Sequence, residues 1–308
     1  MARDDGGALA DRARGAMLGL AIGDALGATV EFMTPREISA QYGVHERICG
    51  GGWLRLEAGE VTDDTTMTLA LGEAWLRARG VPDAEACAQA FDAWMRAKPV
   101  DIGNTVRRGI VRWRLSGSTE APLSSDAGNG ATMRCLPVAL ACLGAAQQVT
   151  AYAALVQARV THNNPLTDVA TLCVVDMVQS ALLGAGQHAI VERAEMLAAQ
   201  CPEFDFHGRH CDNPSGYIVD TMRAVCQSMA RHDGFRAVLT DVVNRGGDAD
   251  TTGAIAGMVM GALCGERALP PAWVGALRPT VRAACISMAT GLIELAPLCY
   301  PQPTRSVI

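Results

Sequence analysis

Aromatic side chains, basic clusters and long apolar runs are all scarce in this sequence of 308 residues. Aromatic residues make up 5% of the chain, and the formal net charge is -6. Nucleic-acid binding needs a concentrated positive face, so DNA and RNA are not expected as general partners. The longest apolar run, residues 251–265, is shorter than the roughly 20 residues of a membrane span. Because Asp250 and Glu266 flank it, we expect a buried helix here and no membrane span.

Paired cysteine motifs are also lacking. The 11 cysteines are an odd number, and they are scattered singly without a CxxC pair. This pattern argues against a disulfide framework or a zinc site, and it predicts reduced thiols in a cytoplasmic protein. Residues 1–15 carry acids and have no continuous apolar segment before a cleavage site, so we expect no signal peptide.

Helical periodicity, in contrast, runs through most of the chain. Apolar residues recur at three-to-four spacing, many of these segments begin near Asp, Asn, Thr, Ser or Pro, and alternating β-branched stretches are hard to find. We therefore predict an all-α fold: one compact many-helix domain over residues 1–308, with loose ends at 1–11 and 300–308. The expected helices cover 12–30, 64–79, 83–97, 104–115, 150–160, 165–183, 217–231, 235–244, 251–265 and 281–295, and the expected loops cover 33–59, 116–130 and 201–216.

Two of these helices have a glycine at every fourth position. The rows are Gly15, Gly19, Gly23 and Gly27 in the first, and Gly253, Gly257, Gly261 and Gly265 in the second. Glycine costs about 1 kcal/mol relative to alanine inside a helix, so a row of glycines needs a compensating gain. Close approach of another backbone provides that gain. We expect both helices to be central and tightly packed, and packing against each other would use both rows.

Carboxylates gather at the ends of these helices. Asp63 and Asp64 lie in VTDDTTMTLA, directly before an apolar helical segment, and Asp248 and Asp250 precede the second glycine helix. Helix capping, worth about 1 kcal/mol, and the helix dipole would explain any one of them. One cap does not require two or three acids, so the surplus favours a metal site. Carboxylate and hydroxyl oxygens suit Mg²⁺ or Mn²⁺ better than zinc, and this many ligands fits a two-metal site.

The order of these motifs resembles that of the ADP-ribosylglycohydrolase family. The motifs are GDALG at 23–27 followed by Glu31, TDDT at 62–65, GNGA at 128–131 followed by MR, TH at 161–162 and GGDADT at 246–251. The likeness runs from about residue 14 to residue 265. The stretches at 23–35, 101–105, 161–165 and 216–221 are most similar to family members that act on ADP-ribosylated dinitrogenase reductase.

The resemblance implies an all-α fold with two Mn²⁺ or Mg²⁺ ions and hydrolysis of ADP-ribose from an arginine side chain. Residues that match the family by position fall into three groups. The metal ligands would be Glu31, Thr62, Asp63, Asp64, Asp248, Asp250 and Thr251. The catalytic acids would be Asp63 and Asp101. The substrate-binding residues would be Asn104, Gly128, Asn129, Gly130, His162 and Tyr217.

Several of these residues have a simpler explanation from sequence alone. Asp101 fits an N-cap of the following helix as well as an acid in a cleft. His162 fits a helix-capping loop, and Asn129 between two glycines is a common turn. His207 and His210 have the spacing of a metal pair but no second cluster, so they stay unassigned. The five tryptophans are expected to pack in the core or on the surface rather than to clamp adenine.

The resemblance also implies a biological role, the reactivation of nitrogenase by removal of ADP-ribose from dinitrogenase reductase. Two alternatives remain: a hydrolase for another linkage, such as serine-linked or O-acetyl-ADP-ribose, and a non-catalytic binding member of the fold. PII-type signal proteins are implied as regulators. A cytoplasmic enzyme is expected, with reversible membrane association only through a partner.

Overall fold

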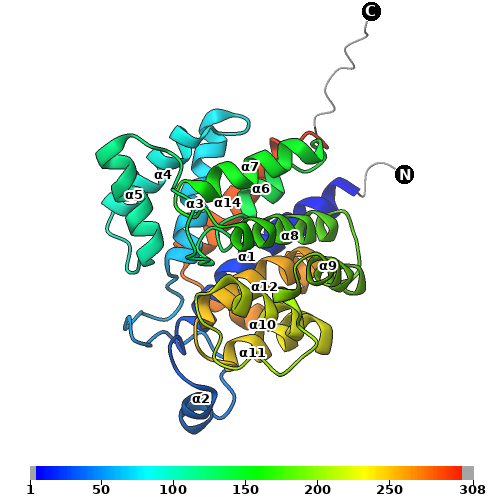
Figure 1. Cartoon of the computed structure of the whole chain (residues 1–308). Coiled ribbons are helices and arrows are strands. Elements are labelled where there is room, and N and C mark those ends of the chain that lie inside the picture. Colours follow the sequence, from blue (N-terminus) through cyan, green and yellow to red (C-terminus); the bar gives the residue numbers. More distant parts are fainter. Residues whose placement is uncertain (1–4, 300–308) are drawn as a thin grey trace, which may run out of the picture.

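The structure is a computed structural model that describes residues 5–299. Its described residues form helices joined by turns and loops, without a β-strand, so the predicted all-α fold is confirmed (Figure 1). The helices are α1 (Asp5–Gly27), α2 (Pro35–Tyr42), α3 (Asp63–Ala78), α4 (Ala84–Arg96), α5 (Asn104–Ser116), α6 (Leu136–Ala141), α7 (Gln147–Arg159), α8 (Pro165–Leu182), α9 (Gln187–Gln200), α10 (Ile218–Arg231), α11 (Phe235–Asn244), α12 (Ala249–Cys264), α13 (Pro271–Ala276) and α14 (Pro279–Glu294), with 3-10 turns η1 (Pro202–Phe204) and η2 (Glu266–Ala268).

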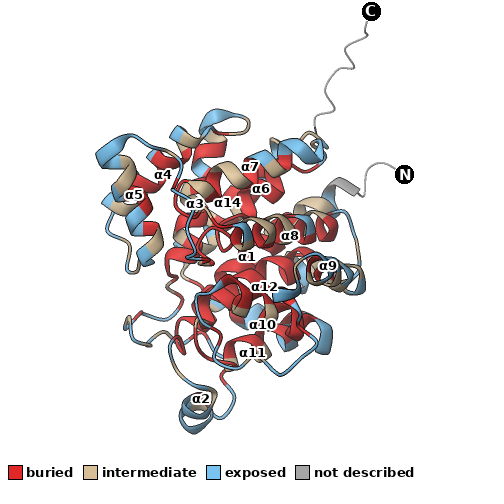
Figure 2. Cartoon of the chain, in the orientation of Figure 1, coloured by how far each residue is buried: buried red, intermediate tan, exposed pale blue. Residues whose placement is uncertain are grey.

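Helices α1 and α12 form the centre of the molecule, and the other long helices surround them (Figure 1). Every residue of α12 from 249 to 262 is buried. Figure 2 shows the same arrangement as a buried interior at α1 and α12 with exposed residues on the outer helices. The apolar run at 251–265 is therefore a core helix, as its flanking acids predict.

The two glycine rows face each other along the contact between α1 and α12. The helices run antiparallel, and the opposed pairs are Gly15 with Gly261, Gly19 with Gly257, Gly23 with Gly253, and Gly27 with Ala249. A methyl group added at Gly19 would overlap the carbonyl oxygen of Gly257, so only glycine permits this backbone spacing. The prediction of two central, tightly packed helices is confirmed, and the two helices pack against each other. As a consequence, the C-terminal end of α1 lies beside the N-terminal end of α12.

Helix α8 is long and apolar enough to cross a membrane when judged by length and composition. However, 56% of its most apolar window is buried within the protein, where α8 packs against α12, α9 and α7. Burial in the protein core accounts for this composition. No disulfide joins any of the 11 cysteines in the structure, and Cys87, Cys135, Cys142, Cys226 and Cys285 are buried, while their reduced state stays a prediction.

The structure differs from the expected elements in several places. Helix α1 begins at Asp5, so the expectation of a loose segment is wrong for residues 5–11, while residues 1–4 and 300–308 lie outside the described residues. Helix α2 occupies part of the expected loop at 33–59. Its start has a capping box, in which Thr34 accepts from the Glu37 amide and the Glu37 carboxylate accepts from the Thr34 amide. Helices α6, α9 and α13 were not expected, and η1 lies in the expected loop at 201–216.

Candidate active site and metal centre

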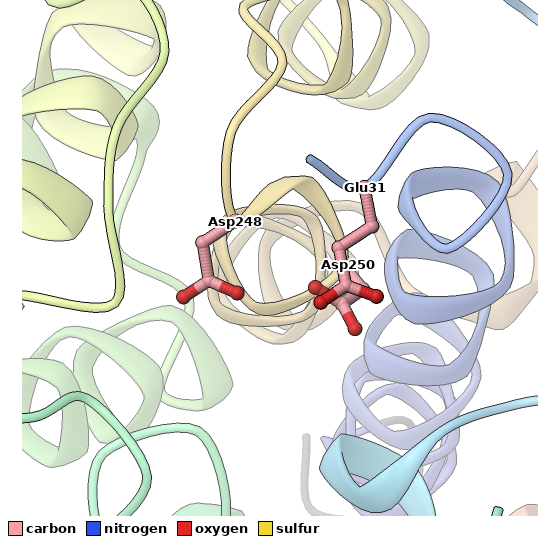
Figure 3. A group of neighbouring side chains, drawn as sticks. All are labelled: Glu31, Asp248 and Asp250. Atoms are coloured by element: carbon pink, nitrogen blue, oxygen red, sulfur yellow. The ribbon is translucent and has the colours of Figure 1, made fainter. Parts of the chain in front are cut away.

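Three carboxylates converge where α1 ends and α12 begins. Glu31 follows α1, Asp248 occupies the N-cap position of α12, and Asp250 lies in the first turn of α12 (Figure 3). One oxygen from each lies within 4.8 Å of the others. The antiparallel glycine contact brings Glu31 to this place, and the positive end of the α12 dipole favours negative charge there. The sequence thus predicts three ligands that the fold does bring together.

The start of α3 meets the same end of α12 through Asp64. Asp64 is fully buried, and its Oδ2 accepts hydrogen bonds from the hydroxyls of Thr62 and Thr251, each at 3.2 Å. Thr62 is the N-cap of α3, and Thr251 belongs to the first turn of α12. Two helix N-termini that are far apart in sequence therefore meet at one carboxylate. The other oxygen of Asp64, Oδ1, is buried without a hydrogen-bond partner.

Asp24 fixes the start of α3, a role that the sequence prediction missed. It lies in α1, is fully buried, and accepts from the amides of Thr62 at 2.9 Å and Thr65 at 3.0 Å and from the Thr65 hydroxyl at 2.6 Å. A carboxylate from one helix thus satisfies amides that the first turn of another helix leaves free. The sequence does carry a signal for this role. Asp24 is a charged residue between Gly23 and Ala25, inside a helical segment whose other residues predict burial.

Burial raises the pKa values of these acids, and the neighbouring carboxylates raise most of them further. The pKa of Glu31 rises to about 8 and that of Asp63 to about 7, with Asp101 the largest charged contributor for Asp63. The pKa values of Asp64 and Asp250 lie well above the usual range for the same reasons. Such a group of buried like charges is unfavourable unless a cation compensates it.

The donor set fits a divalent cation. All of the predicted ligands offer oxygen, which hard cations such as Mg²⁺ and Mn²⁺ prefer. The unpartnered Oδ1 of Asp64 is a buried oxygen with an unused acceptor capacity, and a metal ion or its bound water would satisfy it. Glu31, Asp248 and Asp250 form the closest group, and Asp63 lines the same cleft.

A cleft with a volume of about 340 Å³ opens above these acids. Thr62 and Asp64 lie outside its lining, below the surface. Tyr217 is also outside the lining, with 41% of its surface exposed. The predicted site residues that do line the cleft are Glu31, Asp63, Asp101, Asn104, Gly128, Asn129, Gly130, His162, Asp248, Asp250 and Thr251.

Asp101 is a cleft acid rather than a helix cap. The N-cap of α5 is Gly103, and no side chain caps this helix. Asp101 and Asn104 are instead both part of the cleft wall. The Gly103 amide donates to Asp63 Oδ2 at 3.4 Å, so the start of α5 helps to hold Asp63 beside Asp101. The sequence leaves open whether Asp101 caps a helix or is an acid in a cleft, and the structure supports the acid in the cleft.

The side chain of Asn129 contacts an acid of the cluster. Its Nδ2 donates to Asp248 Oδ2 at 2.5 Å and to the Thr221 hydroxyl at 3.0 Å. The backbone of this loop pairs with the segment before α10, through an isolated antiparallel bridge between Gly128 and Tyr217 and a 3.0 Å bond from the Asn129 amide to the Gly216 carbonyl. Asn129 therefore orients Asp248. Its position between two glycines predicts only a turn and does not reveal this contact.

His162 lies under the loop at 128–130 and presents one ring nitrogen to the cleft. It is buried, and its Nδ1 lies 2.8 Å from the Thr161 hydroxyl. Arg134 donates to that same hydroxyl at 2.8 Å, which leaves the hydroxyl's own hydrogen available to donate to Nδ1. Burial and then the Arg134 charge lower the pKa of His162 to about 3, which keeps the ring neutral. We therefore expect the ring hydrogen on Nε2, beside Gly128.

This arrangement predicts a measurable tautomer. We expect His162 to hold its proton on Nε2, and we expect Thr161→Val to produce a mixture of tautomers because the hydroxyl donor to Nδ1 is gone. Thr161→Ser keeps the hydroxyl and is expected to keep the native tautomer. Nitrogen–proton correlation NMR of ¹⁵N-histidine-labelled protein distinguishes the two forms. A proton on Nδ1 in the unsubstituted protein would contradict the expected chain of hydrogen bonds from Arg134 through Thr161 to His162.

The family model described as ADP-ribosylglycohydrolase matches residues 5–302 of the chain. The chain belongs to the ADP-ribosylglycohydrolase family. The match covers nearly the whole sequence, and the motifs that carry the resemblance all lie within it. Membership makes the chain a glycohydrolase, and the acid cluster at α1, α3 and α12 lies in its candidate active site.

Individual family members are similar over most of their length. The chain is 49% identical to the ADP-ribosyl-[dinitrogen reductase] glycohydrolase of Rhodospirillum rubrum, over 94% of this chain and 97% of that protein. It is 34% identical to the ADP-ribosylarginine hydrolase Tri1 of Pseudomonas putida (strain GB-1), over 86% of this chain and 73% of Tri1. A solved structure titled ADP-ribosylglycohydrolase-related protein complex superposes with a TM-score of 0.83 at 32% identity, and the match covers 93% of this chain and 98% of that one.

Proposed function

We propose that this enzyme removes ADP-ribose from a modified arginine of dinitrogenase reductase and uses two Mn²⁺ or Mg²⁺ ions to do so. The observation that carries the proposal is the acid cluster at the floor of the cleft, built jointly by α1, α3 and α12. The 49% identity to the R. rubrum enzyme, over nearly the full length of both chains, supports the substrate.

The bond to be cleaved joins the anomeric carbon of ribose to a guanidinium nitrogen, and its rupture develops positive charge on the sugar ring. Bound divalent ions would supply a water of lowered pKa and grip the ribose hydroxyls. Asp63 and Asp101, which lie together in the cleft wall, stabilise the developing positive charge and assist proton transfer. The leaving guanidine takes up a proton as it departs.

The part of the cleft lined by residues 128–130 and His162 is suited to the diphosphate of ADP-ribose. Gly128 and Gly130 lie against the His162 ring, where a Cβ would come within 3.1 and 3.0 Å of it, and the hydrogen expected on Nε2 of His162 is a neutral donor there. A neighbouring cavity of about 490 Å³ shares His162 with the cleft and is also lined by Arg108 and Arg112. Anionic groups of the substrate would be stabilised at this side.

The substrate is tested by comparing linkages. With Mn²⁺ present, we expect release of ADP-ribose from ADP-ribosylated dinitrogenase reductase and little release from a matched serine-linked peptide or from O-acetyl-ADP-ribose. Faster hydrolysis of either of these would identify the alternative linkage as the substrate. Binding of ADP-ribose without any hydrolysis would favour a non-catalytic member of the fold. The name of Tri1, an ADP-ribosylarginine hydrolase, supports the arginine linkage.

Regulation and location remain predictions from the resemblance. A cytoplasmic enzyme controlled by PII-type signal proteins, with membrane association through a partner, fits the nitrogenase role. Co-purification of the chain with a PII protein in ammonium-treated cells would test this regulation.

A further inference from the structure

Two cavities adjoin the cleft through different residues. One, of about 490 Å³, shares Thr105, Asp126 and His162 with the cleft, and the other, of about 670 Å³, shares Glu31 and Phe32. The acid cluster, where the reacting bond is expected, lies in the cleft that both cavities adjoin. A substrate with two arms on either side of this bond therefore has room for one arm in each cavity.

The charges of the two cavities differ. The cavity beside His162 has Arg108 and Arg112 in its lining against one acid, Asp126, which pairs with Arg108, so the remaining positive charge suits an anionic arm. The cavity beside Glu31 has no arginine or lysine in its lining, and its acidic members are Glu31 and Glu37. It also contains aromatic side chains, among them Phe32 and Trp53. Acids and aromatic rings together favour a cation, and a planar guanidinium in particular.

The backbone holds Phe32 in an exposed position at the rim. Its φ of 63° lies in the left-handed region, which is uncommon for a residue with a bulky side chain. Its amide donates to the Gly247 carbonyl at 2.7 Å, and the Gly247 amide donates to the Met33 carbonyl at 3.0 Å. These bonds clamp the segment to the loop before α12, while 64% of Phe32 stays exposed. Backbone strain that keeps an apolar ring in solvent is typical of a functional position.

Trp53 is held beside Phe32 by a tight turn. Gly51 and Leu56 exchange backbone hydrogen bonds of 2.8 and 2.9 Å, which places Trp53 near the tip of the turn. Its indole nitrogen donates to Glu31 Oε2 at 2.6 Å, and its ring centroid lies 5.4 Å from that of Phe32. About half of Trp53, 51%, is exposed. The two rings thus form a fixed aromatic platform next to a candidate metal ligand.

We propose that the platform of Phe32 and Trp53 binds the guanidinium end of the modified arginine and the protein segment that carries it. The inference rests on the proposed arginine-linked substrate, and it assigns the leaving-group side of the site. Because the two rings are tilted by 49° to each other, the guanidinium would stack on one of them beside Glu31, while the ADP-ribose arm extends toward His162. Recognition of the protein is then separate from recognition of ADP-ribose.

The test compares a ligand with the arginine and a ligand without it. For Trp53→Ala we expect the KM for ADP-ribosylated dinitrogenase reductase to rise about tenfold, as loss of a partly desolvated cation–π contact predicts, with the Kd for free ADP-ribose unchanged. Trp53→Phe loses the hydrogen bond to Glu31 but keeps an aromatic ring. Because the ring is what binds the guanidinium, we expect a KM within about twofold of that of the unsubstituted protein. Tyr152→Ala removes an exposed aromatic of α7 outside all three cavities and serves as the control.

The outcomes separate this inference from the proposed function. An equal weakening of ADP-ribose binding would show that the platform supports the metal site or the nucleotide arm, and an unchanged KM in Trp53→Ala would show that it does not bind the arginine side. Either result overturns the inference while leaving arginine-linked hydrolysis intact. An unsubstituted enzyme that is inactive on the arginine linkage overturns both.

Discussion

Asp64→Asn is expected to reduce the rate of ADP-ribose release by about a thousandfold or more, because it removes a charge from the site where two helices meet. The substitution keeps the shape of the side chain, and the buried cluster loses one repelling charge. We therefore expect the metal-free variant to be at least as stable as the unsubstituted protein. Its increase in Tm on addition of Mn²⁺ should be much smaller, since that increase reports metal affinity. Activity assays and thermal unfolding with and without Mn²⁺ measure both effects.

Asp176→Asn provides the matched control. Asp176 is an exposed acid on α8 that pairs with Arg193, and a surface pair of this kind contributes at most about 1 kcal/mol. This variant should retain its activity and its Mn²⁺-dependent rise in Tm. If Asp64→Asn also kept both properties, Asp64 would be a structural cap only, and the metal site would have to be built without it.

Gly257→Ala is expected to destabilise the fold by about 3 kcal/mol or more, at the upper end of the usual cost of overpacking. The added methyl group would overlap the carbonyl oxygen of Gly19, and a backbone cannot move aside as a flexible side chain can. The displacement would also shift Glu31 relative to Asp250, so we expect weaker Mn²⁺ binding in any folded fraction. Urea unfolding of the metal-free protein measures the first effect.

Gly7→Ala is the corresponding change at an open position of the same helix, outside its contact with α12. Gly7 lies in α1, is exposed, and has no neighbouring atom within 4 Å of an added methyl group. Its replacement should be neutral or stabilise the protein by up to about 1 kcal/mol, because alanine favours helix. Equal stability of the two variants would mean that α1 and α12 tolerate a wider separation, and the glycine rows would lose their explanation.

The sequence predicts the central part of the fold well because its signals are local and periodic. The fourfold glycine spacing in 15–27 and 253–265 predicts close helix contact, and the apolar periodicity predicts most of the long helices. Helix α2 was missed although Thr34 and Glu37 form a recognisable capping box. The six-residue helices α6 and α13 are too short for periodicity to reveal, since they are fixed by their surroundings.

The candidate site is predictable only in part. The acids at the starts of α3 and α12 are visible in sequence as a surplus over capping needs, and the fold places them together. The roles of Asp24 and Asn129 depend on contacts between distant segments, so no spacing in the sequence reveals them. Trp53 was expected to serve packing, and its exposed position against Glu31 follows from the turn around Gly52 rather than from its residue type.

Titration of chelator-stripped protein with Mn²⁺ tests most directly whether two helix N-termini together hold a catalytic metal centre. We expect two Mn²⁺ ions to bind per chain, and we expect release of ADP-ribose from arginine-linked substrate to be absent before the titration and to rise with occupancy. Asp64→Asn should bind fewer ions under the same conditions. Full activity of the metal-free protein would contradict the metal-dependent mechanism, whatever the acids at α3 and α12 do for the fold.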